Sequence, residues 1–123
     1  MLATAKIIAF VATTDGTRAR RFYETVLGLR VISDDAFALA LDVNGTMLRV
    51  QKVKSLSPAL HTILGWAVLD IKGTVDDLQT KGVEFVKYSG MPQDERGIWR
   101  SPSGASVAWF KDPDGNTLSL TQL

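Results

Sequence analysis

The sequence lacks cysteine, and it contains a single histidine, His61, among its 123 residues. The absence of cysteine excludes disulfides, thiolate metal sites and cysteine nucleophiles, and it fits the cytoplasmic location that we expect. No apolar run approaches the roughly 20 residues that span a membrane. We also expect no signal peptide, because a short apolar run near the first residue soon gives way to polar residues.

A strong charge of one sign is also missing. The formal net charge is +1, and charged residues make up 22% of the chain. The one dense basic cluster (Arg18, Arg20 and Arg21) falls on a predicted helix, where a solvated face is the simplest interpretation. We therefore expect no nucleic-acid partner and no membrane partner. The apolar content of 46% is typical of a globular protein, and we expect one domain over residues 1–123.

What the chain does contain is a pattern of strands and helices that occurs twice. The first half predicts strands over 5–13, 29–32, 36–43 and 46–53, with an amphipathic helix between the first two that ends at Gly28. The second half predicts strands over 62–69, 83–88, 105–111 and 117–122, with a helix capped by Thr74 and closed by Gly82. Residues 54–61 form a connector. A polar loop over 89–104 includes a brief strand near 98–100.

Both halves of the sequence contain residues that are typical of tight turns. Asn44 and Gly45 predict a type I′ hairpin. In the last hairpin, Pro113 suits the second turn position, and we expect Asp114 and Gly115 to adopt left-handed conformations. The two halves overlay at three landmarks, which are Asp15 on Asp70, Gly28 on Gly82, and Gly45 on Gly115. The sequence therefore predicts two βαβββ modules, residues 1–53 and 62–123.

Two segments carry a family resemblance. Residues 22–29 read Phe-Tyr-Glu-Thr-Val-Leu-Gly-Leu, and residues 112–116 read Asp-Pro-Asp-Gly-Asn. Both resemble motifs of the vicinal oxygen chelate superfamily, which includes glyoxalase I, bleomycin-resistance proteins, fosfomycin-resistance proteins and extradiol dioxygenases. The resemblance implies an α+β fold in which tandem βαβββ modules form an open, cup-shaped half barrel with helices on the convex side. It also implies a homodimer.

In metal-dependent members of that superfamily, four inward side chains hold one divalent ion. The resemblance places these positions at Ile8, Arg49, Ile63 and Ser119. Isoleucine has no lone pair to give, arginine is a permanent cation, and one serine cannot hold a divalent metal. His61 lies two residues from the nearest of these positions, and we interpret it as an exposed connector residue. We therefore predict no metal and no cofactor.

Strand alternation predicts which side chains line the cup. The candidate ligand-binding residues are Phe10, Met47, Arg49, Gln51, Trp99, Trp109, Thr117 and Ser119. Arg49 is expected to orient an acidic or polar group of a ligand; the alternatives are an ion pair with Asp42 or Glu95, or a place at the rim. Trp66 should face the helices, whereas the face of Trp109 is left open. Trp99 either covers the cup or packs on a second subunit.

Three functions fit this lining. The first is a small-molecule-binding (sequestering) protein of the glyoxalase/bleomycin-resistance type without a metal site, whose ligand is aromatic or anionic. The second is a metal-independent or atypical lyase or isomerase that uses Arg49 electrostatically and a carboxylate, such as Asp42, as base. The third is an accessory module whose cup is filled by its own side chains. The catalytic residues of the second alternative are not identified by the sequence.

Overall fold

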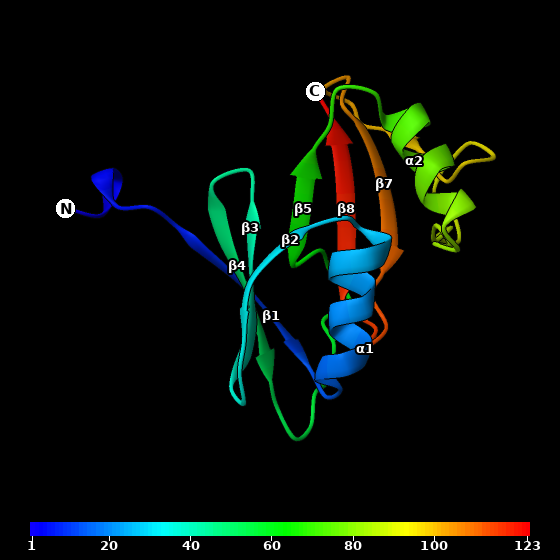
Figure 1. Ribbon diagram of the computed structural model, residues 1–123. Coiled ribbons are helices and arrows are strands. Elements are labelled where there is room, and N and C mark those ends of the chain that lie inside the picture. Colours follow the sequence, from blue (N-terminus) through cyan, green and yellow to red (C-terminus); the bar gives the residue numbers. More distant parts are fainter. The chain divides into compact units, whose positions relative to one another are not determined.

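The computed structural model describes residues 1–123. The chain forms two compact units, Met1–Ser57 and Pro58–Leu123, which we call the first and second modules. Each module contains one four-stranded mixed sheet and helical segments (Figure 1). Neither sheet is closed into a barrel, because each has two edge strands. The expected α+β class is confirmed.

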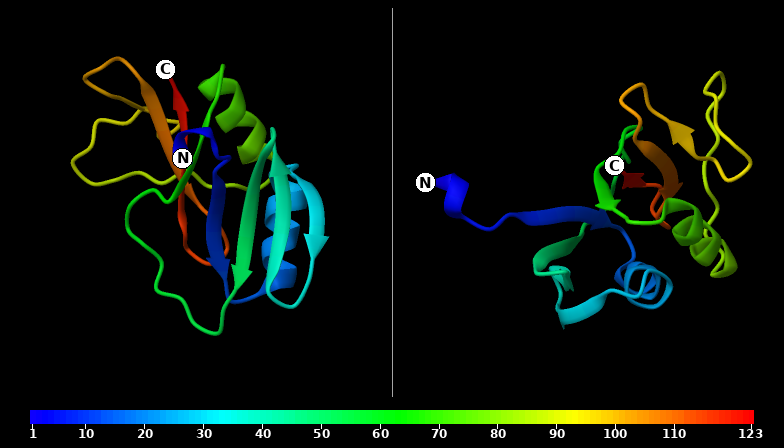
Figure 2. Two further views of the ribbon diagram at one scale, coloured as in Figure 1. Left: turned by 90° about the vertical axis from the view of Figure 1, so that its left-hand side faces the viewer. Right: turned by 90° about the horizontal axis from the view of Figure 1, so that it is seen from above.

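In the first module the sheet has the strand order β1–β4–β3–β2, with β1 parallel to β4 and the other neighbours antiparallel (Figure 2, left). Its strands are β1 (Ile8–Thr13), β2 (Arg30–Asp34), β3 (Ala38–Val43) and β4 (Thr46–Lys52), and a short 3₁₀ turn, η1 (Leu2–Thr4), precedes them. The pairing of β2 with β3 shifts register between Val31 and Ser33, which marks a β-bulge at the outer edge of this sheet.

The predicted first helix changes its winding along its length. An α-helical part, α1 (Gly16–Arg20), continues as a π-helical part, η2 (Arg21–Val26). The Leu27 N–H donates to the Phe22 carbonyl, five residues back, at 2.9 Å. The apolar face is nevertheless the predicted one, since Ala19, Phe22 and Tyr23 are buried.

In the second module the sheet has the corresponding order, β5–β8–β7–β6. Its elements are β5 (Leu64–Ala67), α2 (Ile71–Thr80), β6 (Trp99–Arg100), β7 (Ser106–Lys111) and β8 (Thr117–Gln122). The predicted strand over 83–88 is wrong: this segment contributes one isolated bridge, from Phe85 to Phe110. The outer edge of β7 explains the difference, because β6 occupies its first two residues and leaves only its far end for Phe85.

Both helices begin and end at the landmarks of the internal repeat. The Asp15 carboxylate accepts from the Arg18 N–H, and the Asp70 carboxylate accepts from the Gly73 N–H, each at 3.1 Å. The predicted cap at Thr74 is therefore wrong; its hydroxyl donates to the Asp70 carbonyl from inside the helix. Gly28 and Gly82, which follow the two helices, have positive φ values of 75° and 91°.

The two central hairpins use different turns. Asn44 and Gly45 both have positive φ, as the predicted type I′ turn requires. In the last hairpin only Gly115 is left-handed, so the expectation for Asp114 is wrong. Instead, the Asp112 carboxylate accepts from the Asp114 N–H at 3.0 Å and the Asn116 N–H at 2.9 Å. This side chain shapes the turn and relieves Asp114 of an unfavourable conformation.

Each sheet packs one face against its own helix. Contacts join α1 to β3 and β4, and α2 to β7 and β8, which are the equivalent strands of the two modules. The core lies on these faces and includes Leu39, Leu41, Leu48 and Val50 in the first module, and Ala108, Phe110, Leu118 and Leu120 in the second. We call the opposite face of each sheet its open face. None of the helices has the length and apolar character needed to cross a membrane.

Candidate functional site

The register of the first sheet gathers four predicted site residues on its open face. Phe10 pairs with Arg49, which pairs on its other side with Ala40. Met47 and Gln51 lie two residues to either side of Arg49 on β4 and therefore share its face. Phe10 is half exposed, whereas Val11 beside it is buried in the core. The predicted alternation of the first module is therefore confirmed.

Arg49 carries a charge that nothing in its module neutralises directly. The suggested partner Asp42 is instead paired with Arg30, with the guanidinium nitrogen and carboxylate oxygen 3.2 Å apart. Arg49 itself forms no ion pair or side-chain hydrogen bond within the first module. It contributes to the lowered pKa of Asp35, although the N–H groups of Ala38 and Phe37 cause most of that lowering. An unpaired guanidinium can donate two parallel N–H···O hydrogen bonds to an anionic group.

At the centre of the open face of the second sheet the side chains are smaller than in the first sheet. We call the surface formed there by Gly65 and Ser119 the shelf. Ser119 pairs with Gly65 on one side and with Trp109 on the other. A Cβ atom built on Gly65 would lie 2.8 Å from the Ser119 Oγ and 3.3 Å from its carbonyl oxygen. The backbone of β5 therefore approaches Ser119 more closely than a larger residue would allow. The face of Trp109, which the sequence leaves open, is the face of Ser119.

Two predicted hydroxyl groups on this face differ in their availability. The Thr117 hydroxyl donates to the Ala59 carbonyl at 3.2 Å, and Lys111 Nζ donates to the Thr117 hydroxyl oxygen at 3.4 Å. The Ser119 side chain forms no hydrogen bond within the second module, although the residue is largely buried. Ser119 is thus the hydroxyl with unused capacity, and Thr117 is committed to the connector.

Three aromatic side chains border this shelf, and we call Tyr88, Trp99 and Trp109 the aromatic wall. The ring centres of Trp99 and Trp109 are 6.0 Å apart, and Tyr88 meets Trp109 edge-on at 5.5 Å. Trp66 pairs with Leu120 on the helix-facing side and stacks at 6.3 Å on Phe110, so the prediction for Trp66 is confirmed. Tyr88 was not among the predicted residues, because residues 83–88 read as a strand that would end there.

The four positions at which the family resemblance places metal ligands occupy equivalent places in the two sheets. Ile8 lies two residues before the partner of Arg49, and Ile63 lies two residues before the partner of Ser119. Between them they offer one hydroxyl oxygen and no imidazole or carboxylate. No group of three or more His, Asp or Glu side chains comes together where it could hold a metal ion. These residues do not fit a divalent metal.

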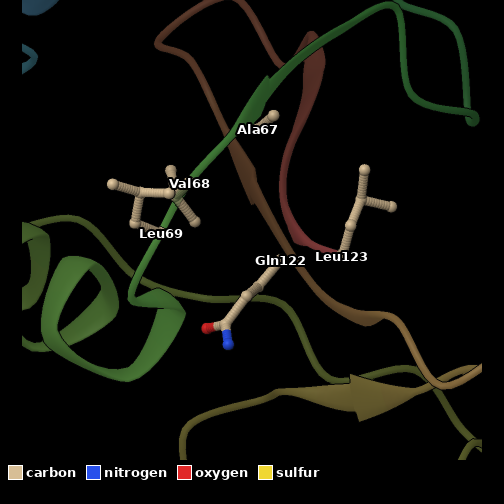
Figure 3. A pocket seen from close by; sticks show the side chains of 5 residues that line it. All are labelled: Ala67, Val68, Leu69, Gln122 and Leu123. Carbon is tan, nitrogen blue, oxygen red and sulfur yellow. The ribbon is translucent and has the colours of Figure 1, made fainter.

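The second module also has a shallow hollow of about 220 Å³ at the ends of β5 and β8 (Figure 3). Its lining consists of Ala67, Val68, Leu69, Gln122 and Leu123. The polar group available to a ligand there, the Gln122 amide, already accepts the Ile71 N–H at 2.9 Å. The Gln122 side chain thus secures the start of α2, and none of the side chains that line the hollow is charged, so we do not assign a function to it.

Comparisons with known proteins agree with this geometry. A family model described as the Glyoxalase/Bleomycin resistance protein/Dioxygenase superfamily matches residues 6–120. A bleomycin-binding protein solved in complex with bleomycin is similar in structure, with a TM-score of 0.74, 21% identity, and coverage of 98% of this chain and 99% of that one.

Two further solved structures show the same fold. A glyoxalase family protein from Enterococcus faecalis has a TM-score of 0.74 and 19% identity, over 97% of this chain and 98% of that one. Lactoylglutathione lyase from Agrobacterium tumefaciens has a TM-score of 0.70 and 18% identity, over 97% and 93% respectively. No curated protein matches the sequence.

Proposed function

Because this chain belongs to the glyoxalase/bleomycin resistance protein/dioxygenase superfamily, we propose that it binds a small molecule through the open faces of its sheets, without a metal. The proposed contacts are Phe10, Met47, Arg49, Gln51, Trp99, Trp109 and Ser119, whereas the Thr117 hydroxyl is bonded to Ala59. A solved neighbour that binds bleomycin supports a binding role for this fold.

One observation carries the proposal, namely the unpaired guanidinium of Arg49. It lies between Phe10 and Ala40 on the open face, where a half-buried cation needs an anionic partner. No carboxylate of its own module forms an ion pair with it. Asp42 is paired with Arg30, and the Asp35 carboxylate, whose pKa Arg49 helps to lower, accepts the N–H groups of Phe37 and Ala38. A ligand carboxylate, sulfonate or phosphate would satisfy it with paired N–H···O bonds.

The open face of the second module, taken by itself, supports a ligand with an aromatic ring. Trp99 and Trp109 present ring surfaces, and Ser119 offers a hydroxyl group with unused capacity beside them. Aromatic side chains next to small residues favour a flat ring that stacks. We therefore propose a planar aromatic anion as the ligand class.

The lyase or isomerase alternative is less well supported by the same contacts. A general base must have a carboxylate, imidazole or amine free to take a proton. Asp42 is the carboxylate on the open strands, and its ion pair with Arg30 favours the role of a fixed charge. Binding without turnover is therefore the function that we propose.

Titration calorimetry with 1-naphthoate tests the proposal. We expect binding of this anion, weaker binding of cyclohexanecarboxylate, and no binding of the cation 1-naphthylmethylammonium. Arg49→Met should weaken 1-naphthoate by about tenfold or more, the usual contribution of a hydrogen bond to a charged group. The control is Arg21→Met, which removes an exposed arginine from the helix of the same module and should have little effect.

Equal binding by the Arg49→Met variant and the unaltered protein would contradict the proposal, and so would tighter binding of the cation. Because the proposed site needs no metal, EDTA should leave the affinity for 1-naphthoate unchanged. The proposal includes a homodimer, as the family resemblance implies, and light scattering would show it as twice the mass of the 13.4 kDa chain.

A further inference from the structure

Two of the three residues of the aromatic wall come from segments with little regular structure. Only Trp109 lies on a long strand, β7; Trp99 lies on the two-residue β6, and Tyr88 lies on no strand. Isolated short strands are weak because few backbone hydrogen bonds hold them. Something other than sheet pairing must therefore fix Tyr88 and Trp99 against Trp109.

Gln93 supplies the first of these fixings. Its amide oxygen accepts the Tyr88 N–H at 2.7 Å, and its amide nitrogen donates to the Val86 carbonyl at 3.0 Å and the Gly97 carbonyl at 2.7 Å. Its backbone also bridges to Trp99. The Gln93 side chain thus connects the segment that contains Tyr88 to the segment that leads into Trp99. All three hydrogen bonds involve backbone groups.

Arg96 supplies the second. Its guanidinium binds the Asp76 carboxylate of α2 through two bonds, of 2.9 and 3.1 Å. The Asp94 carboxylate accepts the N–H groups of Arg96 and Ile98, which places Ile98 in a buried position directly before Trp99. The loop that follows Tyr88, coloured yellow in Figure 1, is thereby attached to the helix beside it.

We infer that Gln93 and Arg96 are positioning residues that hold the aromatic wall in its ligand-binding arrangement before a ligand arrives. Residues 89–104 are then a fixed border of the site rather than a cover that closes. This inference rests on the proposed function for its biological meaning. A wall ordered in advance spares the ligand the cost of ordering it, which increases affinity for flat rings.

The central test compares Gln93→Ala with the unaltered protein, by two measurements that need no ligand. Coupled tryptophans 6.0 Å apart give a paired circular-dichroism signal, which we expect to fall by more than half in the variant. The Tyr88 amide should exchange at least about tenfold faster, as expected for a lost hydrogen bond, while β7 and β8 amides keep their protection. An unchanged signal and unchanged exchange would overturn the inference.

Further variants guard against a general loss of folding. Gln93→Glu keeps the acceptor for Tyr88 but loses both donors, to the Val86 and Gly97 carbonyls. If Gln93→Ala does not fold, this variant should still reduce the dichroism signal, whereas the Tyr88 amide should stay protected. Arg96→Asp should reduce the dichroism signal, and adding Asp76→Arg should restore it. The matched control is Lys81→Ala, which removes an exposed ion pair with Asp77 on the same helix and should change neither measurement.

Binding of 1-naphthoate then separates this inference from the proposed function. If the unaltered protein binds it, Gln93→Ala should weaken binding by about tenfold or more. Unchanged affinity in a variant with a disrupted wall would overturn the inference. If the unaltered protein binds neither 1-naphthoate nor related anions, the proposed function fails, and the dichroism and exchange results alone decide whether Gln93 and Arg96 order the wall.

Discussion

The two modules repeat one topology but present different open faces. At equivalent positions, the first sheet has Phe10 beside Arg49, whereas the second has Gly65 beside Ser119. The first face therefore carries a large apolar side chain beside a cation at these positions. The second carries two small residues there, bordered by aromatic rings. The helix-facing sides stay alike, with aliphatic and aromatic cores and aspartate-capped helices. The internal repeat thus keeps the sides that pack on the helices alike and differs on the open sides, where we propose that a ligand binds.

The largest expected effect tests whether the turns of the two central hairpins are stabilised in different ways. Asp112→Ala removes an acceptor from two backbone N–H groups and from the Asn116 amide, all in or near the core, and should destabilise the fold by about 2–4 kcal/mol. Asn44→Ala forces alanine into a left-handed conformation and should cost only about 1 kcal/mol. Urea unfolding measures both, and equal losses would show that the turns are held in the same way.

The next effect concerns the shelf of the second module. Gly65→Ala places a methyl group against Ser119 and should destabilise the fold by about 1–3 kcal/mol, because the nearby carbonyl belongs to the backbone and cannot move freely. Ala67→Val, two residues along the same strand, should change stability by less than about 0.5 kcal/mol. In an open strand, alanine would be the more stabilising residue, so a gain in unfolding free energy for Gly65→Ala would contradict the close approach.

The smallest effect compares ion pairs of the two modules as pH falls. A hydrogen bond from Lys52, and a weaker contribution from Arg20, lower the pKa of Asp34 below its ordinary value of 3.8. Arg96 lowers the pKa of Asp76 in the same way. Each ionised carboxylate therefore stabilises the fold above about pH 4, and that stability is lost as pH falls through the folded pKa.

Melting temperatures between pH 5 and pH 2.5 measure this loss. Asp34→Asn should flatten the curve more than Asp76→Asn, because Asp34 binds two cations and its side chain is 25% exposed against 53% for Asp76. Parallel curves for Asp34→Asn and the unaltered protein would contradict the role of that carboxylate.

Sequence reasoning succeeded where the information is local. Alternation along β1, β4 and β8 assigned their faces, and Asn44, Gly45, Gly28 and Gly82 marked turns and helix ends, because backbone conformation limits the residues allowed there. The same reasoning failed where segments compete. The strand predicted at 83–88 lost most of its edge to β6, and Thr74 was mistaken for a cap that Asp70, four residues earlier, provides.

The positioning residues of the aromatic wall could not be identified from the sequence. Gln93 and Arg96 are polar residues in a polar loop, and nothing in their spacing predicts contacts with Val86 or Asp76. Their roles depend on distances between segments that only the fold brings together. The face of Trp109 likewise required the pairing of β7 with β8.

The bulge between Val31 and Ser33 has a consequence for the chain's behaviour at high concentration. An edge strand with regular spacing offers its free amides and carbonyls to any extended peptide, which is how sheets grow into aggregates. The extra residue, Ile32, interrupts that spacing in the middle of β2, between the charged Arg30 and Asp34. An incoming strand would find few aligned backbone groups along β2, so we expect this edge of the first sheet to resist the strand pairing that leads to fibres.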